Sequence, residues 1–305
     1  MGQNPPVALF VYNRPDHVRK TLEALEKNID VEKFHIYIFS DAAKDDASVT
    51  AVKATRDLVR NFHGLHIVEI FEQERNVGLA DSIVQGVSRL VHEHGSVIVL
   101  EDDLVTSPYF LTFMSEALMR YRDDRRIMHI NGFSLPIGLK SSGEDVYAFR
   151  QTLSWGWATW KDRWQSFEQD AEILLKRLES RDLLKRLDMD GHFRFSSTLK
   201  ANARGDIHTW AVKWFASVIL EGGIALTPYC SLVQNIGHDD SGTNATLNKD
   251  FETELCREKP SVNLSEFSEQ PEVTRAVIAF YKSIRPSVWR KVATRIGYIT
   301  KRHKV

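Results

Sequence analysis

Short apolar runs alternate with amphipathic segments through the first half of the chain. Four runs rich in Val, Ile, Leu and Phe have the length of buried strands: residues 7–12, 35–39, 65–71 and 96–100. Between them, apolar residues recur at spacings of three and four, which predicts helices over about 16–27, 49–59 and 79–93. This alternation is typical of βαβ units and therefore of a mostly parallel sheet flanked by helices.

The pattern changes after residue 150. Trp155, Trp157, Trp160 and Trp164 are crowded together, and the leucine-rich stretch 171–187 and the apolar run 210–220 are typical of helices. Short strands are expected at 127–130 and 224–227. The second half is therefore α-rich and aromatic.

Composition excludes several classes of protein. The chain has 305 residues with 40 Lys and Arg against 41 Asp and Glu, so a general nucleic-acid-binding surface is not expected. No apolar run approaches the ~20 residues of a membrane-spanning helix. The first residues carry no secretory signal, and two cysteines make neither a disulfide framework nor a thiolate zinc site, so a cytoplasmic location is expected.

Three consecutive carboxylates follow the predicted strand 96–100. Ligands of open α/β sheets bind outside the carboxyl ends of the strands, so Glu101, Asp102 and Asp103 are expected at the mouth of a site. Adjacent carboxylates repel one another unless a cation compensates them, and such oxygen ligands suit Mg²⁺ or Mn²⁺ bridging a diphosphate. The alternative is an exposed acidic strand end or a helix N-cap.

Other polar residues are predicted at the same edge of the sheet. They follow the first strand (Asn13, Arg14), follow the second strand (Asp41) and precede the third helix (Arg75, Asn76). Each of these residues could instead have a purely structural role, as a turn residue or as a helix N-cap. Together they surround one crevice, which favours a binding site.

The order of these motifs resembles the nucleotide-sugar half of GT-A glycosyltransferases. The motifs are Phe10-Val11-Tyr12-Asn13-Arg14-Pro15, Ser40-Asp41, Asn76-Val77-Gly78-Leu79-Ala80 and Val99-Leu100-Glu101-Asp102-Asp103. They are similar to bacterial family 2 enzymes, and the Glu-Asp-Asp form is similar to that of N-acetylglucosaminyltransferase I. The resemblance implies a Rossmann-like GT-A fold with three parts: a donor half (1–135), an acceptor half (136–265) and a C-terminal helical basic extension (266–305).

The resemblance also implies roles for individual residues. Asn13 and Asp41 would contact the donor base or ribose, and Arg75 and Asn76 the nucleotide, with Arg14 beside them. Asp103 would ligate the metal. The family's usual Asp-x-Asp is Glu-Asp-Asp here, so the acid that faces the ribose or diphosphate is either Glu101 or Asp102.

The second half must recognise the acceptor and, in an inverting enzyme, supply a general base. Asp206 precedes the apolar run 210–220 and resembles the acid at the start of the acceptor helix in inverting relatives. Its alternative role is to cap that helix. The chain lacks the Gln-x-x-Arg-Trp sequence of polymer-extruding synthases, which favours addition of a single sugar.

Three further side chains are candidates for ligand contacts. His238, in a glycine-rich polar loop, is expected at the metal or diphosphate, as in similar transferases, with a surface turn as the alternative. Trp155 and Trp157 could offer an aromatic platform to a donor or acceptor sugar, or could belong to the core. Trp160 and Trp164 are expected in the core.

The carboxyl end, residues 281–305, contains eight Lys and Arg residues and no acid. Val288, Val292, Ile296 and Ile299 fall on one helical stripe, which predicts a basic amphipathic helix that holds the protein to an anionic membrane surface. A solvated tail is the alternative. The protein is then expected on the inner face of the cell membrane.

These features predict a metal-dependent, inverting glycosyltransferase. It would move a sugar from a nucleotide diphosphate donor to a glycan or lipid-linked glycan acceptor in surface polysaccharide synthesis. Two alternatives are a catalytically silent glycan-binding or membrane scaffold module and a sugar-1-phosphate nucleotidyltransferase. The second is disfavoured because Tyr12-Asn13-Arg14-Pro15 stands where that class has a glycine-rich loop.

Overall fold

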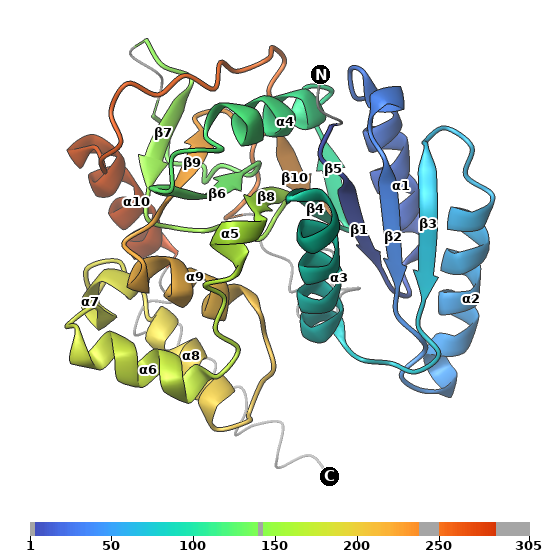
Figure 1. Ribbon diagram of the computed structural model, residues 1–305, viewed down its shortest axis with the longest axis horizontal. Helices are drawn as coiled ribbons and strands as arrows, with labels where there is room; N and C mark the ends of the chain where they lie inside the picture. Colours follow the sequence, from blue (N-terminus) through green and yellow to red (C-terminus); the bar gives the residue numbers. More distant parts are fainter. Residues whose placement is uncertain (1–3, 140–142, 238–249, 285–305) are drawn as a thin grey trace, which may run out of the picture.

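The structure is a computed structural model that describes residues 4–139, 143–237 and 250–284. One eight-stranded sheet runs through both halves in the order β3-β2-β1-β4-β8-β6-β9-β7 (Figure 1). The strands are β1 Val7–Val11, β2 Ile36–Ser40, β3 Ile67–Glu72, β4 Ser96–Glu101, β6 Ile127–Asn131, β7 Val146–Phe149, β8 Trp157–Trp160 and β9 Ile224–Pro228. Strands β1 to β4 are parallel, β8 and β7 are antiparallel to their neighbours, and β6 is parallel to β9. The expected mixed, mostly parallel sheet is confirmed.

A small second sheet lies beside the carboxyl end of β4. It pairs β5 (Leu104–Thr106) with β10 (Val233–Asn235) in antiparallel register, so that Asn235 lies opposite Leu104. This pairing brings the chain after residue 233 against the segment that follows the acidic triplet.

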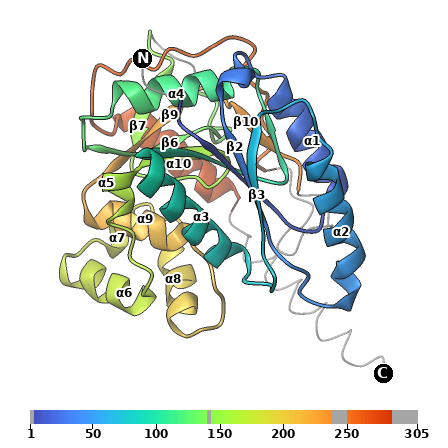
Figure 2. The same ribbon diagram turned by 45° about the vertical axis from the view of Figure 1, so that its right-hand side comes forward.

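Helices cover both faces of the parallel strands. In Figure 2, α1 (Pro15–Glu26) and α2 (Asp46–Arg60) lie on one side of β1 to β3, and α3 (Leu79–His94) lies on the other. The side chains of β1 alternate accordingly: Val7 and Leu9 join the core cluster of α1, while Ala8 and Phe10 join that of α3. Because β1 is covered on both faces, its sequence is continuously apolar.

The remaining helices belong mostly to the second half. They are α4 Phe110–Arg120, α5 Lys161–Trp164, α6 Ala171–Ser180, α7 Leu184–Leu187, α8 Phe195–Ala203, α9 Ala211–Leu220 and α10 Pro271–Ser283, and a 3-10 turn η1 spans Val31–Lys33. The helix expected over 171–187 is interrupted, and Asp182 between α6 and α7 has a positive φ of 55°. In the part of the chain that the structure describes, no helix is both long and apolar enough to cross a membrane.

Two findings differ from expectation or fall outside it. Cys230 and Cys256 are paired as a disulfide with Cα atoms 5.4 Å apart, whereas the cysteine count predicted no disulfide framework. A single pair between distant loops leaves no spacing signature in a sequence. The expected basic helix, from residue 285 onward, lies outside the described residues.

A cluster of tryptophans joins the two halves on the α3 side of the sheet. Trp157 is fully buried and stacks on Trp210 at 5.0 Å and on His129 at 5.1 Å between ring centroids. Trp160 and Trp164 are also buried, as expected. Burial lowers the pKa of His129 to about 3, and its Nδ1 accepts a hydrogen bond from Trp214 Nε1 at 3.0 Å. His129 is therefore neutral and part of the core.

This burial predicts a pH dependence of stability. The pKa of His129 is about 3 in the folded chain and 6.5 in an ordinary setting, so the unfolded chain binds the extra proton as the pH falls. Stability from this residue is complete above pH 6.5 and is lost toward pH 3. Between these limits the slope is at most about 1.4 kcal/mol per pH unit.

Urea unfolding of wild type and His129→Gln from pH 4 to 7 measures this slope. Glutamine can accept from Trp214 and donate to the Leu153 carbonyl, as His129 does. The variant should show a shallower slope. Equal slopes in the two proteins would contradict the assignment.

Candidate active site

The parallel register of β1 and β4 places two polar segments side by side. Phe10 lies opposite Glu101, so the residues after β1 meet the acidic triplet after β4. The backbone N–H of Tyr12 donates to the Asp102 carboxylate at 3.2 Å, and the Thr21 hydroxyl of α1 donates to the Asp102 carbonyl at 2.9 Å. The predicted meeting of these segments at one sheet edge is confirmed.

Asp103 contacts both the segment after β1 and the end of β10. Its Oδ2 lies 3.1 Å from Arg14 Nη1, and both side chains are largely buried. Asn235 Nδ2 approaches its Oδ1 at 3.5 Å, and the backbone N–H of Ile236 donates to its carbonyl at 2.9 Å. A Cβ at Gly237 would clash with the Asp103 carboxylate and with Arg14 Nη1, so a side chain at this position would displace them.

One member of the site was missed by sequence reasoning. His17 Nε2 lies 2.7 Å from Arg14 Nη2, and the residue is buried in the first turn of α1. Its spacing of three residues from Arg14 is the signal that could have found it, because residues i and i+3 share a helix face.

Burial and mutual repulsion raise the proton affinity of the acids. Burial, then the charges of Asp103 and Asp102, raises the pKa of Glu101 well above its usual range. Burial and the charge of Asp103 raise the pKa of Asp102 to about 7, against the opposing effects of the Tyr12 N–H and of Arg14. The surroundings of Glu101 and Asp102 therefore disfavour the charged forms of both carboxyl groups.

Asp41 fixes the start of α3. The residue is buried, and its carboxylate accepts from the backbone N–H groups of Val77 at 3.0 Å and Gly78 at 2.8 Å. It also accepts from Asn76 Nδ2 at 2.9 Å. Asp41 and Asn76 thus hold the loop between β3 and α3. The N-cap of α2 is Asp45, not Asp41.

Arg75 and Asn13 stand at the same edge. The Arg75 side chain is exposed and Asn13 is partly buried; within the described ranges, no hydrogen bond or ion pair engages either side chain. Their contact with the nucleotide stays a prediction.

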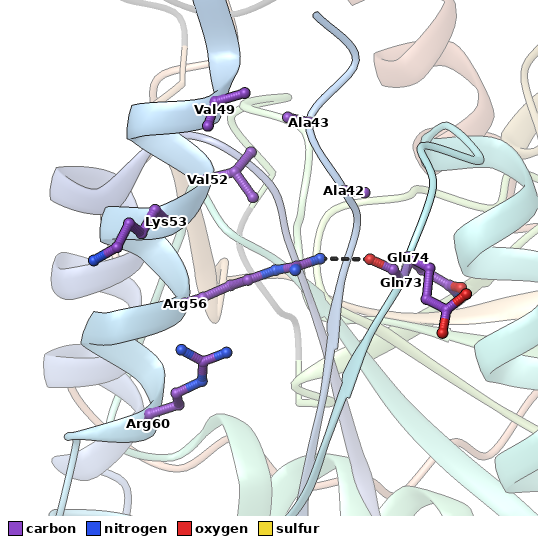
Figure 3. A pocket seen from close by; sticks show the side chains of 9 residues that line it. All are labelled: Ala42, Ala43, Val49, Val52, Lys53, Arg56, Arg60, Gln73 and Glu74. Carbon is purple, nitrogen blue, oxygen red and sulfur yellow. Dashed lines mark hydrogen bonds between the residues drawn. The ribbon is translucent and has the colours of Figure 1, made fainter. Parts of the chain in front are cut away.

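A pocket of about 410 Å³ lies on the α2 side of this edge. In Figure 3, Arg56 extends from α2 toward Gln73, and Val49 and Val52 line the upper wall. Arg56 Nη2 donates to the Gln73 carbonyl at 2.8 Å and to the carbonyls of Ser40 and Asp41, each at 3.3 Å. Arg56 therefore ties the carboxyl ends of β2 and β3 together beneath Asp41.

The two candidate aromatic residues occupy different settings. Trp157 lies in the core, as described above, so its faces are covered by Trp210 and His129 and it offers no platform at the surface. Trp155 is partly buried and packs edge-on against Phe133 at 4.6 Å and Phe251 at 5.6 Å. Of the pair, only Trp155 stays a candidate for contact with a sugar.

Asp206 lies in the loop between α8 and α9. Its side chain is about half exposed, and Arg204 Nε donates to its Oδ2 at 2.8 Å. The alternative role as a helix cap is wrong, because α9 begins at Ala211 and its N-cap is Trp210. The role as a general base stays a prediction.

The metal site is only partly described. Among the residues that the structure covers, no three His, Cys, Asp or Glu side chains form a cluster that could hold an ion. His238 lies outside the described residues, so its expected role as a ligand stays a prediction.

The hydrogen bonds of Asp41 predict a structural cost on its removal. Asp41→Ala would leave the N–H groups of Val77 and Gly78 without their acceptor, which should lower the free energy of unfolding by about 2 to 4 kcal/mol. Asp45→Ala is the matched control, since loss of a helix N-cap typically costs about 1 kcal/mol. Urea unfolding measures both. Wild-type stability of Asp41→Ala would contradict this structural role of Asp41.

Comparisons with known proteins place the chain in a family. The solved structures similar to it include a mannosyltransferase from Pyrobaculum calidifontis in complex with GDP-Man and Mn²⁺ (13% identity, TM-score 0.38, 58% of this chain and 47% of that one). They also include TarS from S. aureus (13% identity, TM-score 0.37, 54% and 29%), so the chain spans under half the length of either. No curated protein matches at a significant level. The family profile "Glycosyl transferase family 2" matches residues 7–173, which include the strands and loops of the site and amount to more than half of the chain. The chain, with its mixed sheet of GT-A type, therefore belongs to glycosyl transferase family 2.

Proposed function

We propose that the protein is a metal-dependent, inverting glycosyltransferase. It would move a sugar from a nucleoside diphosphate donor to a glycan or lipid-linked glycan acceptor in surface polysaccharide synthesis. The observation that supports this proposal best is the run of three consecutive carboxylates, Glu101, Asp102 and Asp103, at the carboxyl end of β4 beside the end of β1 in a family 2 chain. Exposed Arg75 and the Arg14 guanidinium supply positive charge at the same edge.

The chemistry of these acids fits a divalent cation. Their carboxylate oxygens are hard ligands, and a cation would favour the charged form of Asp102, which burial and the charge of Asp103 disfavour. Mg²⁺ is commonly held by one or two carboxylates together with substrate phosphates. Asp103 would hold the ion, with His238 as a second candidate, and the bound ion would stabilise charge on the leaving diphosphate.

Other residues would bind the nucleotide and activate the acceptor. Arg75 and Asn13 would bind the nucleotide, while Asp41 and Asn76 keep the β3–α3 loop in place beside it. Asp206 would take the proton of the acceptor hydroxyl as its oxygen attacks the anomeric carbon. The bond from that carbon to the diphosphate oxygen breaks on the opposite face, so the configuration is inverted and the nucleoside diphosphate leaves.

Two parts of the proposal rest on the sequence alone. Attachment to an anionic membrane surface depends on the basic residues between 281 and 305, nearly all outside the described part, and the cytoplasmic location depends on composition. A scaffold module without activity is the alternative, and hydrolysis of a donor in the presence of Mn²⁺ would separate it from an enzyme.

Donor binding tests the proposal directly. A panel of UDP-, GDP- and dTDP-sugars with Mn²⁺ should include one that raises the melting temperature, because a ligand at 100 times its Kd stabilises the folded chain by about 2.7 kcal/mol. Asp103→Asn should lose this Mn²⁺-dependent stabilisation, and Asp123→Asn, a change at a highly exposed acid, should keep it. Equal stabilisation of Asp103→Asn and wild type would remove Asp103 as the metal ligand.

Asp206→Asn tests the general base separately from binding. Asparagine retains the size of the side chain and an oxygen for Arg204 but cannot take the proton. Turnover should fall by about 10²- to 10⁴-fold with donor affinity unchanged. Wild-type turnover, or a product that retains the anomeric configuration of the donor, would refute the inverting mechanism through Asp206.

A further inference from the structure

The loop that carries Asp206 reaches across to the donor half. His208 Nε2 lies 2.7 Å from Asp81 Oδ1, and Asp81 belongs to the first turn of α3. Both side chains are about half exposed, at 60% and 46%. The pair therefore joins residues 127 positions apart in the chain at the surface.

Asp81 is fixed relative to the donor residues. It lies three positions after Gly78, whose N–H is bound by the buried Asp41 carboxylate. Asp41 also holds Asn76 and Val77, so the start of α3 moves with the carboxyl end of β2. A side chain that binds Asp81 is consequently held at a fixed position relative to the carboxyl ends of the parallel strands.

Two further hydrogen bonds of the loop remain within the second half. Thr209 N donates to Asn202 Oδ1 at 2.8 Å, and Asp206 N donates to the Ala201 carbonyl at 3.0 Å. These bonds tie the loop to α8. By themselves they do not set its position relative to α3.

The charge of Asp81 also acts on Lys213 of the same half. Lys213, in the first turn of α9, is 8% exposed, and no hydrogen bond or ion pair engages its ammonium among the described residues. Burial lowers the pKa of Lys213, while attraction to Asp81 and Asp170 opposes that shift. The charge of Asp81 is thus shared between His208 by direct contact and Lys213 at longer range.

We propose that the contact between Asp81 and His208 sets the position of the Asp206 loop relative to the donor site. Both are positioning residues, and their effect on catalysis rests on the proposed function, in which Asp206 is the base. The contact is suited to a loop that opens and closes, because exposed ion pairs add little to global stability. Its loss should shift the loop without unfolding the chain.

Hydrogen exchange tests the positioning without reference to activity. The reporters are the backbone amides of Asp206 and Thr209, which are hydrogen-bonded in the loop. Asp81→Ala and His208→Ala should each speed their exchange by about 2- to 5-fold, the range for an exposed pair. The double variant should equal either single one, because both changes remove the same contact.

Two controls accompany these variants. Glu93→Ala removes an exposed acid at the other end of α3, which pairs with Arg89 of the same helix, and should leave exchange in the loop and turnover unchanged. His208→Gln keeps a nitrogen that can donate to Asp81 and should restore most of the protection. Additive effects of the two alanine changes, or wild-type exchange in both, would overturn the proposal.

Turnover then connects the contact to catalysis. With the donor found in the panel, both alanine variants should lower kcat by about 2- to 5-fold, at unchanged donor Kd and melting temperature, and His208→Gln should recover it. Faster exchange with wild-type kcat would refute the effect on Asp206 while leaving the transferase proposal intact. Absence of transfer by the wild-type protein with every donor would instead refute the proposed function, and the exchange result would still decide whether the contact holds the loop.

Discussion

The site depends on the compensation of three consecutive carboxylates at the end of a buried strand. The parallel register of β1 and β4 forces Glu101, Asp102 and Asp103 against the residues after β1. Burial and the charge of Asp103 raise the pKa of Asp102 to about 7 in spite of the Tyr12 N–H and the Arg14 guanidinium. A cation bound at these carboxylates would favour their charged forms and so offset both effects.

The surrounding structure holds this arrangement from both sides. Arg56 ties the ends of β2 and β3 through their carbonyls, and Asp41 above it holds the start of α3. On the other side, β5 and β10 bring residues 235–237 onto Asp103. Positions far apart in the chain are thus fixed at one edge of the sheet. Helix α3 connects this edge to Asp81, which contacts the loop between α8 and α9.

Local patterns in the sequence predicted the first half well. Apolar runs and helical spacing are short-range signals, so the strands around Val7 and Ile98 and the helix from Leu79 could be predicted from them. The meeting of the segments after β1 and β4 could be predicted because parallel strands end at one edge of the sheet. The role of Asp41 in holding the start of α3 could not be predicted, because its carboxylate binds backbone N–H groups 36 and 37 residues away in the chain.

The second half was harder because its decisive contacts are long-range. Trp155 and Trp157 are two residues apart, yet only the packing of Trp210 and His129 shows that Trp157 is buried. The cysteine pair and the contact of His208 with Asp81 likewise depend on the tertiary fold.

The measurement that tests the account most directly is the anomalous scattering of Mn²⁺ in crystals grown with the nucleoside diphosphate that binds. The account predicts a manganese peak roughly 2 Å from an Asp103 carboxylate oxygen, and a peak away from the acidic triplet would contradict it.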